Sequence, residues 1–178
     1  VSNFATQGTW SFYGIEKFSW SKMEVGLSLG FVGLMVAIVQ GGLIRVIIPK
    51  LGQERSLFLG LAINALGLAA FAFASSSWMM YAIMVPFAIG GLAGPAFQGI
   101  ISNQVGKNEQ GELQGGLTSL MSIAAIVGQP LMLGLFRTFT KENAPIYFPG
   151  APFLMGGLLS LISLLLVFRT IKKENLKD

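Results

Sequence analysis

Four long stretches of this chain contain no Lys, Arg, Asp or Glu, and this feature constrains the fold most. They cover residues 25–44, 56–106, 113–136 and 143–168. An α-helix rises about 1.5 Å per residue, so about 20 apolar residues cross a hydrocarbon core of about 30 Å. The second stretch is long enough to cross twice, with the serines at 75–77 as a turn. The pattern predicts an all-α fold, a polytopic transmembrane helical bundle.

We expect six helical segments, at about residues 1–13, 23–44, 56–74, 78–101, 112–136 and 149–168. Polar loops are expected between them, notably at 14–22 and 45–55. The first segment is too short to cross a bilayer, and the chain starts at Val1 without an initiator Met. We therefore interpret residues 1–178 as one membrane domain of a longer protein, with its first helix truncated.

Composition argues against several classes of function. Charged residues make up 11% of the chain, against about 25% in ordinary soluble domains. The basic residues lie at segment ends and form no single patch, so we expect no nucleic-acid partner. Cysteine and histidine are absent, which removes disulfides, the commonest metal ligand and the usual general base. We expect no catalytic residues, no metal site, no cofactor and no enzymatic activity.

The distribution of Lys and Arg predicts an orientation. If the segments cross alternately, four basic residues lie on one side and eight on the other. The four are Lys17, Lys22, Arg137 and Lys141, and the eight are Arg45, Lys50, Arg55, Lys107, Arg169, Lys172, Lys173 and Lys177. Loops rich in Lys and Arg stay in the cytoplasm. We therefore expect the C-terminal tail to be cytoplasmic.

Small residues form a stripe along the second segment, at steps of three and four. They are Gly26, Gly30, Gly33, Ala37 and Gly41. Such a stripe lies on one helix face and permits close contact with another helix in lipid. Two interpretations stay open and are compatible: plain helix packing, or a sliding surface in a transporter that rocks.

Polar residues on the fifth segment also share a face, at Gln114, Thr118, Ser122 and Gln129. An unpaired amide is costly in hydrocarbon, so this face should point toward protein or water. The hydroxyls of Thr118 and Ser122 have an alternative, because they can bond to carbonyls of their own helix.

Two further features lie in the third and fourth segments. Asn64 sits in mid-span, where it can serve as a hydrogen-bond anchor between helices or as a cavity residue. The fourth segment carries Gly90, Gly94 and Pro95, and Pro95 should kink the helix because it lacks a backbone donor. Such a kink can serve packing alone, or it can line a cavity.

Two local patterns carry a family resemblance. The first joins residues 95–99, Pro-Ala-Phe-Gln-Gly, to residues 110–115, Gln-Gly-Glu-Leu-Gln-Gly. The second is Leu-Thr-Ser-Leu at 117–120, which leads to Ile-Val-Gly at 126–128. Together they resemble the tenth and eleventh helices of the tetracycline-resistance antiporters of the major facilitator superfamily. The loop with Arg45, Lys50, Gly52 and Arg55 looks like the second-half copy of that superfamily's basic cytoplasmic loop motif.

The resemblance implies that the chain is the C-terminal half of a twelve-helix transporter in a bacterial inner membrane. It implies proton-coupled export of small lipophilic compounds or drugs, powered by a proton gradient. The partners would be the lipid bilayer, a small-molecule substrate and the N-terminal half of the transporter. On this analogy the substrate-cavity candidates are Asn3, Gln7, Asn64, Gln98, Thr118, Ser122 and Gln129.

The chain departs from the family pattern at three positions. Pro49 stands where the loop motif usually has an acidic residue, Asn64 where the antiporters carry an aspartate, and Gln129 precedes Pro130. No titratable residue lies deep in any expected span, so a proton-carrying carboxylate would belong to the N-terminal half. The alternative hypothesis is a membrane scaffold or assembly module that transports nothing.

Overall fold

The computed structural model describes residues 2–106, 108–144 and 146–174, and among these it contains only helices and their connections. Five helical stretches are long and apolar enough to cross a membrane. The fold is therefore the all-α membrane bundle that the charge-free stretches predict. In chain order the elements are α1 (Phe4–Phe18), α2 (Lys22–Ile38), η1 (Val39–Leu43), α3 (Ile44–Leu51), α4 (Gln53–Phe73), α5 (Ser77–Ile89), η2 (Gly90–Leu92), α6 (Ala93–Ser102), α7 (Gln110–Thr140) and α8 (Ala151–Glu174).

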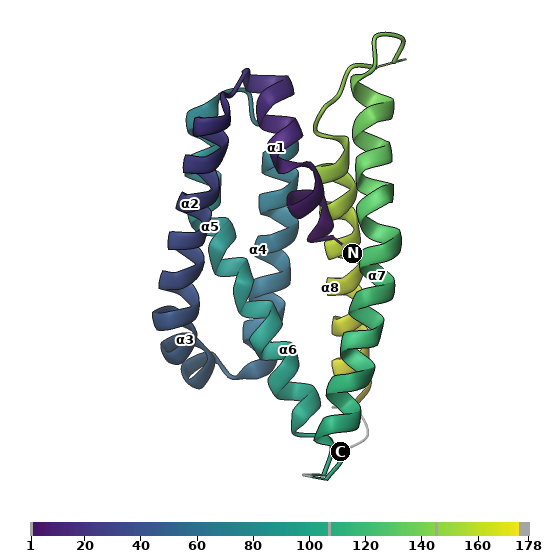
Figure 1. Cartoon of the computed structure of the whole chain (residues 1–178). Coiled ribbons are helices and arrows are strands. Elements are labelled where there is room, and N and C mark those ends of the chain that lie inside the picture. The colour runs from purple at the N-terminus through teal and green to yellow at the C-terminus, as the bar shows by residue number, and fades with distance from the viewer. Residues whose placement is uncertain (1, 107, 145, 175–178) are drawn as a thin grey trace.

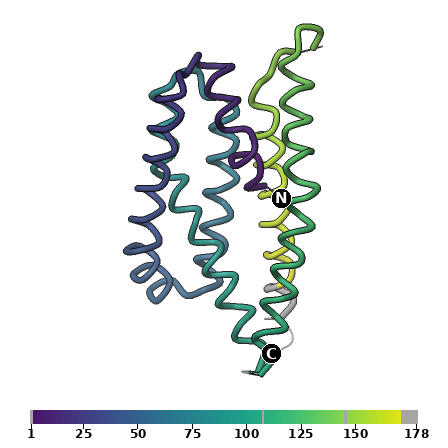
Figure 2. The backbone as a smooth tube through the Cα atoms, in the orientation of Figure 1, coloured from purple at the N-terminus to yellow at the C-terminus, as the bar shows by residue number. Residues whose placement is uncertain are grey.

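The helices run between two ends of the bundle, called here the upper and lower ends as they stand in Figure 1. The α1–α2 and α4–α5 connections lie at the upper end, and the α3–α4 and α6–α7 connections lie at the lower end. Figure 2 shows that α1 occupies only the upper half of the bundle. The most extensive packing is between α4 and α8, and α4 also packs against α5 and α6.

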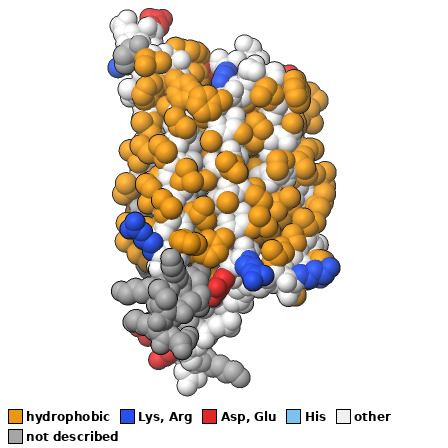
Figure 3. Space-filling view, turned by 180° about the vertical axis from the view of Figure 1, so that it is seen from behind, with side chains coloured by type: hydrophobic (Ala, Val, Ile, Leu, Met, Phe, Trp, Pro, Cys, Tyr) orange, Lys and Arg blue, Asp and Glu red, His pale blue; other side chains and the backbone are white. Residues whose placement is uncertain are grey.

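The surface is that of a protein in lipid. In Figure 3 apolar side chains cover a broad band, and charged side chains gather above and below it. Large apolar residues such as Leu66, Ile126 and Leu165 are more than half exposed. A soluble protein rarely exposes so large a continuous apolar surface, whereas hydrocarbon solvates it. Figure 3 therefore supports the transmembrane interpretation.

Two expected loops are wrong in part, because the helices extend into them. Residues 14–18 continue α1, which ends where Ser19 adopts a left-handed conformation and donates to the Ile15 carbonyl. Arg45, Pro49 and Lys50 belong to α3, and that helix ends at Gly52, whose φ is 83°. Charged residues at the membrane boundary do not by themselves end these two helices. Each helix ends instead at a residue with positive φ, a conformation that glycine adopts without steric cost.

Aromatic packing joins α1 to the rest of the upper half. The Trp10 ring lies edge-on to Phe71 of α4 and Phe153 of α8, with centroids 5.3 Å and 6.3 Å away. The Tyr13 hydroxyl donates to the Phe71 carbonyl at 2.7 Å. In this way three helices share one buried cluster.

At the upper surface, the Tyr147 hydroxyl donates to Glu16 at 3.0 Å, and burial together with this carboxylate raises the pKa of Tyr147.

Some glycines permit very close contacts between helices. The glycines of the stripe, which runs along α2 into η1, make no such contact with the described residues. A Cβ added to Gly60 would lie 2.6 Å from the backbone nitrogen of Ala93, so α4 and α6 nearly touch there. Gly157 of α8 also lies close to α4, where an added Cβ would be 3.2 Å from the Ala65 carbonyl oxygen. By contrast, a Cβ at Gly26, Gly30, Gly33 or Gly41 would meet nothing within 4 Å. Packing of this stripe against another helix stays a prediction.

We expect Gly60→Ala to lower the free energy of unfolding by about 1–3 kcal/mol, because α4 and α6 must separate to admit the methyl group. The matched control is Gly134→Ala on α7, where the added Cβ meets nothing within 4 Å. Thermal unfolding of the purified variants in detergent measures both. Equal melting temperatures for the two variants would show that the α4–α6 contact is not as close as described.

Candidate functional site

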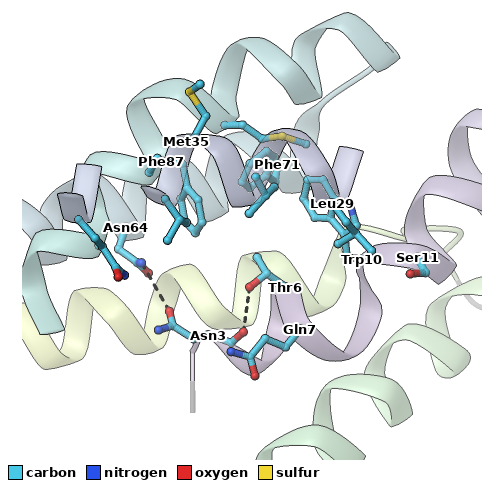
Figure 4. Close-up of a pocket in the computed structure, with 16 residues that line it drawn as sticks. Asn3, Thr6, Gln7, Trp10, Ser11, Leu29, Met35, Asn64, Phe71 and Phe87 are labelled. Atoms are coloured by element: carbon cyan, nitrogen blue, oxygen red, sulfur yellow. Dashed lines mark hydrogen bonds between the residues drawn. The ribbon is translucent and has the colours of Figure 1, made fainter. Parts of the chain in front are cut away.

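A cavity of about 450 Å³ opens between α1, α2, α4 and α5 in the upper half of the bundle. Four amide side chains reach it: Asn3, Gln7, Gln40 and Asn64. Thr6 and Ser11 add hydroxyl groups. Figure 4 shows the α1 residues on one side and Asn64 with the apolar side chains across from them. Such a cavity, mainly apolar with a few polar groups, is typical of small-molecule sites.

Asn64 connects three helices at the edge of the cavity. Its Oδ1 accepts a hydrogen bond from Ser160 of α8 at 3.1 Å, and its Nδ2 donates a long one, 3.5 Å, to Oδ1 of Asn3. Asn64 thus bonds to two other helical segments and also lines this cavity, while a role in holding substrate stays a prediction. Because the Ser160 hydroxyl donates to Oδ1 of Asn64, the amide nitrogen of Asn64 points toward Asn3 and the cavity.

We expect Asn64→Leu to lower the free energy of unfolding by about 1–2 kcal/mol, because it leaves the buried Ser160 hydroxyl without its partner. Adding Ser160→Ala to the Asn64→Leu variant should lower the free energy of unfolding by almost nothing more. A double-mutant cycle, measured by thermal unfolding, tests the coupling. Strictly additive losses from the two substitutions would show that the side chains do not interact.

The apolar wall of the cavity consists of aromatic rings and flexible thioethers. Trp10, Phe71 and Phe87 supply the rings, and Met35 and Met84 supply the thioethers. The Trp10 ring is held in place, because its Nε1 donates to Ser28 of α2 at 3.0 Å. Aromatic faces favour flat or apolar ligands, and methionine adapts to irregular shapes. The wall can therefore accept a partly lipophilic molecule.

The cavity is electrically neutral as far as the described chain defines it. None of its 16 lining residues is titratable. Amides and hydroxyls can form hydrogen bonds with a ligand, but they cannot take up or release a proton at ordinary pH. The described residues of this cavity can therefore form hydrogen bonds with a small molecule but cannot themselves exchange a proton with it.

The structure brings together three of the seven cavity candidates: Asn3, Gln7 and Asn64. The other four, Gln98, Thr118, Ser122 and Gln129, do not line this cavity. The last three are exposed on α7, where the Ser122 hydroxyl bonds to the Thr118 carbonyl at 2.9 Å. Their place in a larger cavity, completed by another half, stays a prediction.

Most residues of the cavity wall do not stand out in the sequence. Trp10 and Phe71 look like ordinary core residues, and Gln40 lies near the end of an apolar span. Steps of three and four connect Leu29, Val32, Val36 and Gln40 and place them on one helix face, a periodicity that could have indicated the lining. Which face meets the cavity depends on helix rotation, which only packing determines.

An irregular turn lies just before Pro95, and the kink expected at Pro95 itself stays a prediction. Gly90–Leu92 forms a short 3-10 turn, η2, between α5 and α6, and Gly91 lines the cavity. A proline ring crowds the carbonyl four residues earlier, which here is that of Gly91. Gly90 packs against Asn64, whereas a Cβ on Gly94 would meet nothing.

The basic residues of the proposed loop motif gather at the lower end. Arg45, Lys50 and Arg55 are exposed around Gly52. Beside them the Asn103 amide donates to Oε1 of Gln53 at 3.2 Å and joins the start of α4 to the end of α6. Lys107 and residues 175–178 lie outside the described residues, as do the side chains of Lys172 and Lys173.

Comparisons with known proteins point in one direction. The family model described as Major Facilitator Superfamily matches residues 1–178. The chain is 36% identical to the class G tetracycline resistance protein of Vibrio anguillarum over 155 residues, 87% of this chain and 38% of that protein. It is 38% identical to the class E protein of Escherichia coli over 134 residues, 75% of this chain and 33% of that protein. The chain thus spans less than half the length of these relatives, and no solved structure matches it significantly.

Proposed function

Because the chain belongs to the major facilitator superfamily and is similar to its tetracycline-resistance proteins, we propose that it is half of a secondary transporter that exports small lipophilic compounds. The observation that carries this proposal is the cavity beside Asn64, whose rings and neutral amides suit such a ligand. A membrane scaffold would have no use for that lining. Secondary transporters of this fold bind substrate near the midplane, between two repeats that rock about it.

The second half would cover surfaces that this chain leaves open. The glycine stripe of α2 faces no described residue, and most of α7 before Gly128 is exposed. Thr118 and Gln129 lie on that exposed part, and polar groups of this kind are poorly satisfied by lipid. We infer that both regions face an N-terminal half, which also supplies the titratable group for proton coupling.

One uptake experiment tests both the proposed substrate and the proposed energy source of the transporter. Everted membrane vesicles that contain the complete transporter should accumulate tetracycline when a proton gradient is imposed. A protonophore should abolish the accumulation, because the gradient drives it. Tetracycline serves as the probe because the relatives carry that name. Uptake no greater than in vesicles without the transporter would contradict the proposal for this compound.

We expect the lower end to face the cytoplasm of a bacterial inner membrane, because Arg45, Lys50 and Arg55 lie there. The chain has no cysteine, so single cysteines can be placed at Ser76 at the upper end and at Lys50 at the lower end. In intact spheroplasts an impermeant thiol reagent should label Ser76→Cys and leave Lys50→Cys unlabelled until the cells are lysed. The reverse pattern would invert the orientation.

A further inference from the structure

One glutamine at the start of α7 holds the connection between α6 and α7. Nε2 of Gln110 donates to the carbonyl of Ser102, the last residue of α6, at 2.8 Å, and makes a longer bond of 3.5 Å to the Val105 carbonyl. The last carbonyls of a helix have no partner within that helix. If α6 continued, the N–H of Gly106 would reach the Ser102 carbonyl, but it donates to Glu109 at 3.2 Å instead. Gln110 therefore supplies a donor that the α6 backbone does not.

The same end of α6 is also joined to α4. Asn103, which follows α6, donates to Oε1 of Gln53 at the start of α4, at 3.2 Å. Gly99 of α6 leaves room for the Gln53 side chain, because an added Cβ would lie 2.5 Å from its Nε2. Gly99 and Gln110 belong to the two parts of the first pattern that carries the family resemblance. Both parts of this pattern thus serve one junction, at which α4, α6 and α7 are joined at the lower end of the bundle (Figure 1).

Little else connects α6 with α7 among the described residues. α7 packs against α1 and α8, whereas α6 packs against α4 and η2. The upper part of α7 is held closely, because a Cβ on Gly128 would lie 2.6 Å from the ring of Phe4 in α1. Before Gly128 most of α7 is exposed. Gln110 thus makes the side-chain link that sets how the exposed part of α7 stands relative to α6.

From this geometry we propose that Gln110 is a positioning residue for transport, which makes the lower ends of α6 and α7 move as one unit. The inference rests on the proposed function, in which this bundle rocks against a second half. α6 continues η2, whose Gly91 lines the cavity, and α7 carries the exposed surface assigned to the second half. The link transmits a displacement of that surface to the cavity wall. Without the link, α7 would pivot alone about its upper contact with α1.

Three variants separate the link from a simple change of charge. Gln110→Glu keeps the shape of the side chain but replaces its N–H donors by a carboxylate, which only accepts hydrogen bonds and repels the Ser102 carbonyl. Gln110→Lys keeps a donor, because a lysine near a helix C-terminus can bond to the last carbonyls of that helix. Gln104→Glu is the matched control, since it places a carboxylate in the same connection at an exposed side chain that takes no part in the described bonds of the junction.

The link itself is tested by the distance between α6 and α7 in the complete transporter without other cysteines. Spin labels on Phe97→Cys and Leu120→Cys report on one helix each, because both positions are exposed. We expect Gln110→Glu to broaden the distribution of distances between the two labels, while Gln110→Lys and Gln104→Glu keep the parent distribution. An unchanged distribution in Gln110→Glu would overturn the link, and so would equal broadening in Gln104→Glu.

The positioning role has its own measurement, the export of tetracycline by the complete transporter. Gln110→Glu should lower the maximal rate per folded molecule about fivefold, the size expected for one lost hydrogen bond. The half-saturating concentration should change little, because Gln110 does not line the cavity. Gln110→Lys should restore the maximal rate, and Gln104→Glu should not lower it.

A role in folding alone would reduce the amount of folded protein and leave the rate per folded molecule unchanged, and that result would overturn the positioning role. A failure of the proposed function is distinguishable from this result. If the parent transporter moved no tetracycline, the proposed export of that compound would fail, and the distance measurement would still decide whether Gln110 links α6 to α7.

Discussion

The Trp10→Ala variant should lose about 3 kcal/mol of unfolding free energy and most of its export activity. Trp10 is only 5% exposed and lies at the meeting point of α1, α4 and α8. Truncation leaves a void in that cluster, which lipid cannot fill. It also removes the indole partner of the Ser28 hydroxyl and one aromatic face of the cavity. Thermal unfolding and tetracycline uptake measure the two losses.

The matched control is Trp78→Ala in α5. Trp78 is 71% exposed at the upper end, where tryptophan fits the membrane interface. Its removal should change the unfolding free energy by no more than about 0.5 kcal/mol. Equal losses from the two tryptophan variants would show that the shared cluster around Trp10 does not hold α1 in place.

The membrane fold could be predicted from the sequence because lipid leaves the backbone few choices. Within hydrocarbon every N–H and C=O must bond internally, so long charge-free stretches become helices. The expected spans 56–74 and 78–101 lie close to the observed Gln53–Phe73 and Ser77–Ser102. Helix ends were harder to place: α3 continues past its basic residues to Leu51 because only Gly52 has the backbone conformation that ends it.

The candidate site could be predicted only in part, because it depends on how the helices rotate against one another. Asn3, Gln7 and Asn64 stand out as polar residues in apolar segments, and they meet. Gln129 stands out equally but lies on an exposed face. The sequence pattern is the same in both cases. Rotation and tilt follow from packing contacts such as Gly157 against Ala65, whose partners no single segment reveals.

We infer that this chain builds half of a transport pathway and needs a second half to complete it. If so, the chain alone should not export, because alternating access requires two bundles that rock about a shared site. Most of α7 before Gly128 and the glycine stripe of α2 would remain exposed, so the isolated chain should also be less stable or self-associate.

The most direct test is reconstitution of the purified chain in liposomes, alone and together with the N-terminal half of the same transporter. Tetracycline transport is driven by an imposed proton gradient and compared with that of protein-free liposomes. We expect the chain alone to match the protein-free control and the two halves together to restore transport. Gradient-driven transport by the chain alone, above that control, would contradict the claim that it is one half of the pathway.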